Sequence, residues 1–74
     1  MSNRRVIHIK AGERKFIPVK TGTKEIECLA GVSKISNRDR TVSRLLQPGS
    51  QLKLKSPSIY FIDAKTDMLL SVCG

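Results

Sequence analysis

Side chains that could do covalent or acid–base chemistry are few in this sequence and far apart. His8 is the single histidine, and Cys28 and Cys73 are the two cysteines. His8 falls in a strand-like segment distant from both thiols, so no nucleophile–base pair is indicated. The two cysteines lack the Cys-x-x-Cys spacing of common metal sites, and together with His8 they do not predict a metal site. We therefore expect no catalytic residue, no cofactor and no metal, and we expect that the protein is not an enzyme.

The six carboxylates do not form a catalytic pair either. Asp63 and Asp67 fall in a segment that resembles a hairpin loop, where aspartate is favoured for local hydrogen bonding. No glycine-rich loop of the phosphate-binding type is present. A chain of 74 residues has a thin core, which leaves little room for a pocket of several hundred Å³.

The basic residues are the most informative feature of the chain. Fourteen Lys and Arg against six Asp and Glu give a net charge of +8, which favours an anionic partner. Arginine can contact phosphate or guanine in a bidentate manner. The same residues could also form an ordinary solvated face. The candidate phosphate contacts are a central cluster, a pair on a predicted strand and a basic arm: Lys34, Arg38, Arg40, Arg44, Lys53, Lys55, Arg4 and Arg5.

This pattern predicts a nucleic-acid-binding accessory or regulatory protein. Aromatic residues are limited to Phe16, Tyr60 and Phe61. Stacking on single strands is therefore disfavoured, and duplex DNA is the favoured partner. The alternative is a non-catalytic protein-interaction module, a small inhibitor or assembly factor that binds an acidic face of a larger machine. A homo-oligomer is also open, because so small a core benefits from a partner.

The chain is expected to form one domain over residues 1–74 in the cytoplasm. No run of 18 apolar residues occurs, and charges interrupt the N-terminal segment too often for a signal peptide. In a reducing compartment Cys28 and Cys73 are expected to be free thiols rather than a disulfide.

Alternating apolar residues predict strands over residues 4–10, 15–20 and 51–55, separated by turns at 11–14, 21–23 and 47–50. Pro18 cannot donate a ladder hydrogen bond, so its strand is expected at a sheet edge or at a bulge. Residues 58–62 and 68–73 are rich in β-formers. We predict that they pair as a hairpin across a loop at residues 63–67.

Residues 23–46 fit either strands or helices. Residues 25–33 look like the first helix and turn of a helix-turn-helix, and residues 41–46 look like its recognition helix. Two mismatches argue against that motif: Glu27 occupies a position for a small residue, and about five extra residues separate the halves, which the tight turn does not accommodate. We do not assign the family.

The predicted fold is mainly β, a small barrel or sandwich of five to seven short strands. It would contain at most one or two short helices, within residues 23–46. The alternative is an α+β fold in which two β-hairpins flank a central helix pair.

Overall fold

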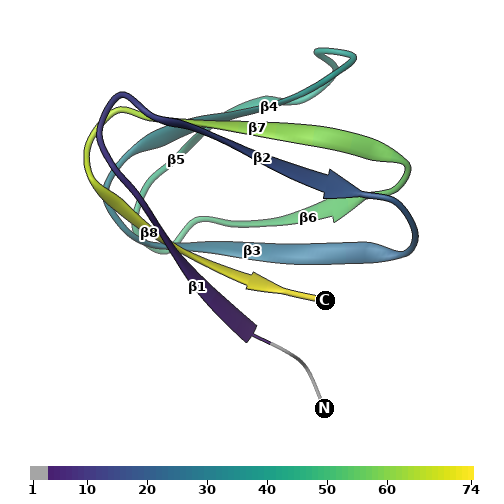
Figure 1. Cartoon of the computed structure of the whole chain (residues 1–74), viewed down its shortest axis with the longest axis horizontal. Helices are drawn as coiled ribbons and strands as arrows, with labels where there is room; N and C mark the ends of the chain where they lie inside the picture. The colour runs from purple at the N-terminus through teal and green to yellow at the C-terminus, as the bar shows by residue number, and fades with distance from the viewer. Residues whose placement is uncertain (1–3) are drawn as a thin grey trace.

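A computed structural model describes residues 4–74 and contains eight strands. Residues 1–3 of the predicted domain lie outside the described part. Figure 1 shows the path of the chain. The strands are β1 (Arg4–Ile9), β2 (Arg14–Val19), β3 (Thr23–Ala30), β4 (Ser33–Asn37), β5 (Ser43–Leu46), β6 (Gln51–Lys55), β7 (Ser58–Ala64) and β8 (Met68–Cys73).

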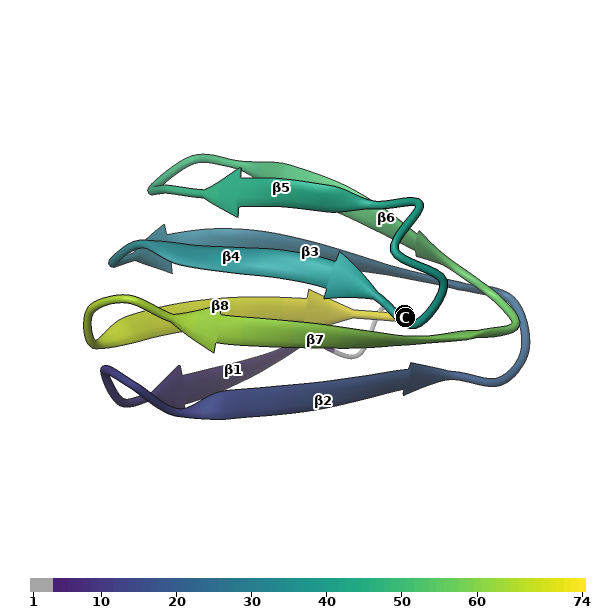
Figure 2. The same ribbon diagram turned by 90° about the horizontal axis from the view of Figure 1, so that it is seen from above.

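The strands form two four-stranded antiparallel sheets that pack face to face. The first sheet has the order β1-β8-β3-β6, and the second has the order β2-β7-β4-β5. Seen from above, each strand of one sheet lies against the strand at the same place in the other, so that β1 faces β2 and β6 faces β5 (Figure 2). The prediction of a mainly β sandwich is confirmed, with eight strands instead of five to seven.

The core lies between the sheets and is almost entirely aliphatic. Alternation along each strand places one set of side chains inside, as in β7, where every second residue from Tyr60 to Ala64 is buried. The apolar residues with 0% exposure come from both sheets and meet in the middle: Ile35, Leu54, Ile62 and Leu70. Burial of these side chains is the main force that holds the two sheets together.

The predicted C-terminal hairpin is wrong, although both of its strands exist. β7 pairs with β2 and β4 in the second sheet, whereas β8 pairs with β1 and β3 in the first. The connecting segment passes from one sheet to the other and is fixed by hydrogen bonds to the β3–β4 turn. Lys65 N donates to Val32 O (2.8 Å), and Val32 N donates to Thr66 Oγ1 (3.0 Å). Alternation shows that both strands face a core but does not show whether they pair or face each other.

The helices considered for residues 23–46 are absent from this part of the structure, which contains β3, β4 and β5. The helix-turn-helix interpretation is therefore wrong as well. Ile26 and Cys28 are buried two residues apart, which is the period of a strand. Asn37 closes the β4–β5 turn: its Oδ1 accepts from Val42 N (3.0 Å), and its Nδ2 donates to Thr41 Oγ1 (2.8 Å).

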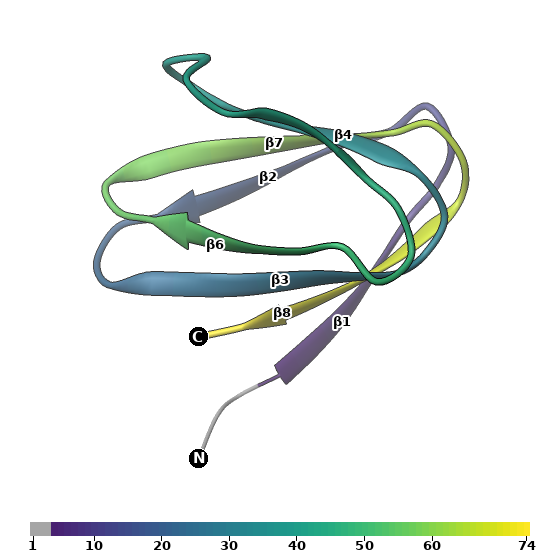
Figure 3. The same cartoon turned by 180° about the vertical axis from the view of Figure 1, so that it is seen from behind.

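Pro18 lies on an edge strand, as predicted, because β2 is the outermost strand of the second sheet. Figure 3 gives the view from behind, where β5 and β6 form the opposite edge of the sandwich. In the residues that the structure describes, no helical segment has the length and apolar character needed to span a bilayer.

Candidate ligand-binding site

Three cationic residues occupy positions on their strands where core residues are expected. Arg5 precedes Ile7 by two residues on β1, so that the two share one side of the strand. Lys15 likewise precedes Ile17 by two residues on β2, and Lys24 precedes the buried Ile26 by two residues on β3. The inward side of these strands is thus apolar in the middle and cationic towards the start of each strand.

These cations line a cleft of about 530 Å³ at the edge of the sandwich where β1 faces β2. The apolar part of its wall includes Ile7, Ile17 and Val72. The full lining is Arg4, Arg5, Ile7, Lys15, Phe16, Ile17, Pro18, Lys24, Val72 and Gly74. We call this hollow the basic cleft. The expectation that so small a chain leaves little room for a pocket of several hundred Å³ is wrong, because the two sheets leave a hollow of that size at this edge.

The charged side chains that line the basic cleft are all cationic. No Asp or Glu side chain is among the described residues that line it, whereas four cations are. The ion pairs within residues 4–74 lie elsewhere: Arg14 Nε is 2.6 Å from Asp63 Oδ1, and Lys53 Nζ is 3.9 Å from Glu25 Oε1. Like charges that converge over an apolar wall repel one another, and an anion placed among them relieves that repulsion.

The predicted phosphate-binding residues do not share one surface. Lys34 and its register partner Asp63 lie on the outer face of the second sheet. Arg38 and Arg40 lie in the β4–β5 loop, Arg44 lies on the edge strand β5, and Lys53 and Lys55 lie on the edge strand β6. Arg4 and Arg5 lie on β1 at the opposite edge. Of the eight predicted residues, these last two alone line the basic cleft.

Lys15 and Lys24 line the basic cleft and were missed by the sequence analysis. The alternation of side chains along their strands could have identified them, because a Lys on the core-facing side of a half-buried strand is unusual. The predicted binding residues rested instead on the density of cations along the chain. Density favoured the central arginines, which the fold places on an exposed loop and an edge strand.

No protein-family model matches the chain, and no curated protein matches it. Solved structures do. Ectoine synthase from P. lautus superposes with a TM-score of 0.82 at 20% identity, over 99% of this chain and 53% of that protein. A cupin-2 domain protein from Shewanella frigidimarina gives 0.80 at 12% identity, over 99% and 69%. The FeII form of HppE in complex with substrate gives 0.81 at 14% identity, over 99% and 45%.

This likeness establishes the fold, which is that of the cupins. The chain spans about half the length of ectoine synthase. The prediction of a nucleic-acid-binding accessory protein, with its protein-interaction alternative, is corrected by this finding, since the similar structures are a synthase, cupins and a substrate-bound enzyme. The expectation that the chain is not an enzyme is corrected for the same reason, because the fold accommodates enzymes.

One of these similar structures contains iron, but the residues that the structure of this chain describes do not fit a metal site. The interior is lined by aliphatic side chains, and His8 is exposed on β1. Cys28 is the one buried thiol in residues 4–74, and its Sγ lies 3.3 Å from Gly31 O and 3.5 Å from Ala30 O. Burial raises the pKa of the Cys28 thiol, which disfavours the thiolate that a metal requires.

Proposed function

We propose that the protein binds a small organic anion in the basic cleft, with the charged group among Arg5, Lys15 and Lys24 and a short hydrocarbon part against the apolar wall. The observation that carries this proposal is the convergence of Arg5, Lys15 and Lys24, with no Asp or Glu side chain beside them, on one hollow of about 530 Å³. Pockets of this size, largely apolar with a few placed polar groups, are typical of small-molecule sites. The cupin fold agrees with this proposal, because a similar structure, HppE, was obtained in complex with its substrate.

The ligand's charge supplies specificity, and the apolar wall supplies affinity for the hydrocarbon part. A hydrogen bond to a charged group contributes about 1.5–3 kcal/mol. Burial of each methylene group adds roughly 0.8 kcal/mol. A short-chain carboxylate such as hexanoate should therefore bind more tightly than either acetate, which lacks the chain, or 1-hexanol, which lacks the charge.

Removal of two cleft cations should weaken hexanoate binding by about tenfold or more, because at least one charge-assisted hydrogen bond is lost. The variant is Lys15→Gln with Lys24→Gln, and calorimetric titration at fixed ionic strength measures the dissociation constant. The matched control, Lys34→Gln with Lys55→Gln, removes the same charge from surfaces outside the cleft.

The control variant should bind hexanoate nearly as the parent protein does. Equal weakening by both variants would mean that net charge alone attracts the anion, and the cleft would then not be the site. Absence of hexanoate binding to the parent protein at millimolar concentration would also overturn the proposal, and so would binding of 1-hexanol as tight as that of hexanoate.

A further inference from the structure

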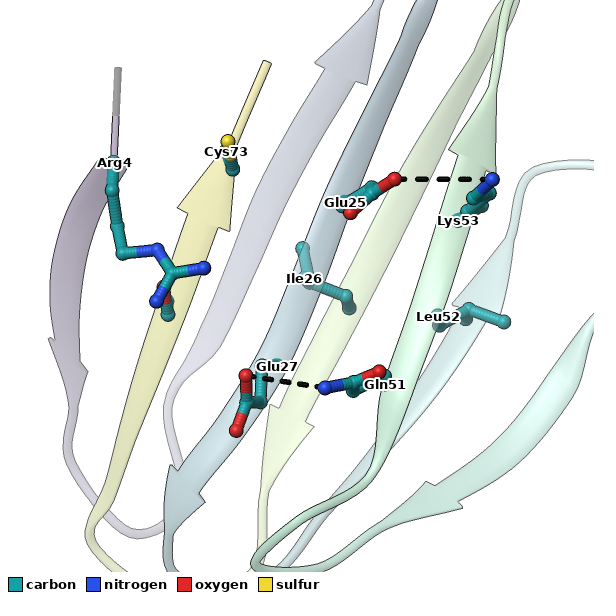
Figure 4. A pocket seen from close by; sticks show the side chains of 9 residues that line it. Arg4, Glu25, Ile26, Glu27, Gln51, Leu52, Lys53 and Cys73 are labelled. Carbon is teal, nitrogen blue, oxygen red and sulfur yellow. Dashed lines mark hydrogen bonds and ion pairs between the residues drawn. The ribbon is translucent and has the colours of Figure 1, made fainter. Parts of the chain in front are cut away.

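A second hollow lies on the outer face of the first sheet, and it is formed by a strand of small side chains between strands of long ones. Its volume is about 290 Å³. Ser71 and Cys73 project outward from β8, with Arg4 on β1 at one side and Glu25 and Glu27 on β3 at the other. Figure 4 shows Arg4 and the two glutamates on opposite sides of β8. We call this hollow the outer trough.

The two walls of the outer trough have opposite charge. Arg4 is the register partner of Cys73, and Cys73 is in turn the partner of Glu25, so cation and carboxylate face each other across one strand. Neighbouring strands are about 4.8 Å apart, so the backbones of β1 and β3 lie roughly 10 Å apart. That separation leaves room between the two walls for a molecule of the size of an amino acid.

The present partners of the glutamates leave most of their hydrogen-bonding capacity free. Glu25 Oε1 is 3.9 Å from Lys53 Nζ, and both side chains are more than 60% exposed. Glu27 Oε1 accepts a long hydrogen bond of 3.4 Å from Gln51 Nε2. Both contacts are on the β6 side, away from Arg4 (Figure 4). Exposed ion pairs of this length contribute little to stability, so a ligand can compete with them.

The floor of the outer trough contains a buried hydroxyl. Ser71 is 2% exposed and lines the hollow. A ligand group placed on the floor can hydrogen-bond with this hydroxyl, which can both donate and accept. This hydroxyl is independent of the charges on the walls and points to the same hollow.

We infer that the outer trough binds a small zwitterion, with its carboxylate towards Arg4 and its ammonium group between Glu25 and Glu27. A simple anion would be repelled by the two glutamates, and a simple cation would be repelled by Arg4 and Lys53. A molecule with both charges meets an opposite charge at each wall. This site lies on the outer face of the sheet and does not depend on the ligand proposed for the basic cleft.

The probe is free alanine, compared with alaninamide, which keeps the ammonium group alone, and propionate, which keeps the carboxylate alone. Calorimetry and amide chemical-shift titration of the whole chain should show alanine binding in the millimolar range. The two single-charge analogues should bind about tenfold more weakly than alanine, because each lacks one charge-assisted contact.

Two variants locate the site without touching Arg4, which also lines the basic cleft. Glu25→Gln with Glu27→Gln should weaken alanine binding by about tenfold or more, and Ser71→Val should block it by filling the floor. The charge-matched control is Glu13→Gln with Asp39→Asn, both outside the trough. Hexanoate binding should be unchanged in the glutamate variant, which separates this site from the basic cleft.

Equal affinity of the parent protein for alanine and alaninamide would overturn the inference, because the positive wall would then have no role. Equal alanine binding by the glutamate variant and its control would do the same. If Ser71→Val does not fold, the glutamate variant still decides, since both of its side chains are on the surface and Gln preserves their shape.

Discussion

Replacing Leu70 by alanine should lower the free energy of unfolding by about 2–5 kcal/mol. Leu70 is 0% exposed on β8, an interior strand of the first sheet, where it pairs with Ile7 and Cys28. The smaller side chain leaves a cavity between the sheets, and so small a domain has few other contacts that could compensate. Such a loss is a large part of the stability of an ordinary domain. Urea denaturation followed by circular dichroism measures it.

The control for Leu70 is Leu45→Ala. Leu45 is 56% exposed on the edge strand β5, so its truncation should change the free energy of unfolding by less than about 1 kcal/mol. Ile62→Ala, at a 0% exposed position on β7, should behave like Leu70→Ala. A similar small effect for all three substitutions would show that the core does not lie between these two sheets.

Replacing Gly31 by alanine should destabilise the fold by about 3 kcal/mol or more. Gly31 has a φ of +84°, and a Cβ at this position would lie 2.2 Å from Asp67 O and 2.7 Å from Met68 Cα. Both are backbone atoms, so no side-chain rotation relieves the overlap. The segment that leads from β7 to β8 would have to move away from the β3–β4 turn, and the hydrogen bond from Val32 N to Thr66 Oγ1 would be strained.

Gly12→Ala provides a matched control for this close approach. Gly12 has nearly the same φ, +85°, but a Cβ there would meet nothing within 4 Å. The control therefore measures the backbone strain alone, about 1–2 kcal/mol. If the two substitutions cost the same in urea denaturation, the contact between the β3–β4 turn and the β7–β8 connection is not as described.

The strands of this protein could be predicted from sequence because alternation and turn residues are local signals. The segment 51–55 matches β6, and Pro18 correctly marked an edge strand. The pairing of β7 and β8 could not be predicted in the same way. The two strands are adjacent in the chain, and both show alternating side chains, which is also the pattern of a hairpin. The hydrogen bond between Val32 and Thr66, which holds the connection as it passes from one sheet to the other, joins residues far apart in sequence.

Part of the candidate site could have been predicted and part could not. Lys15 and Lys24 are in phase with buried isoleucines, and that phase can be read from the sequence. Their convergence with Arg5 depends on β1 and β2 occupying the same edge in different sheets. The central arginines misled the analysis because a dense charge run on an exposed loop resembles a binding element, although solvation alone accounts for it.

The basic cleft is tested most directly by an amide chemical-shift titration of the whole chain with hexanoate. We expect saturable shifts that centre on the cleft, at Ile7, Ile17, Lys24 and Val72, while the β4–β5 loop at residues 38–42 stays unchanged. Saturable shifts centred on that loop, or shifts that grow linearly and equally at every exposed Lys and Arg, would contradict an anion site between β1 and β2.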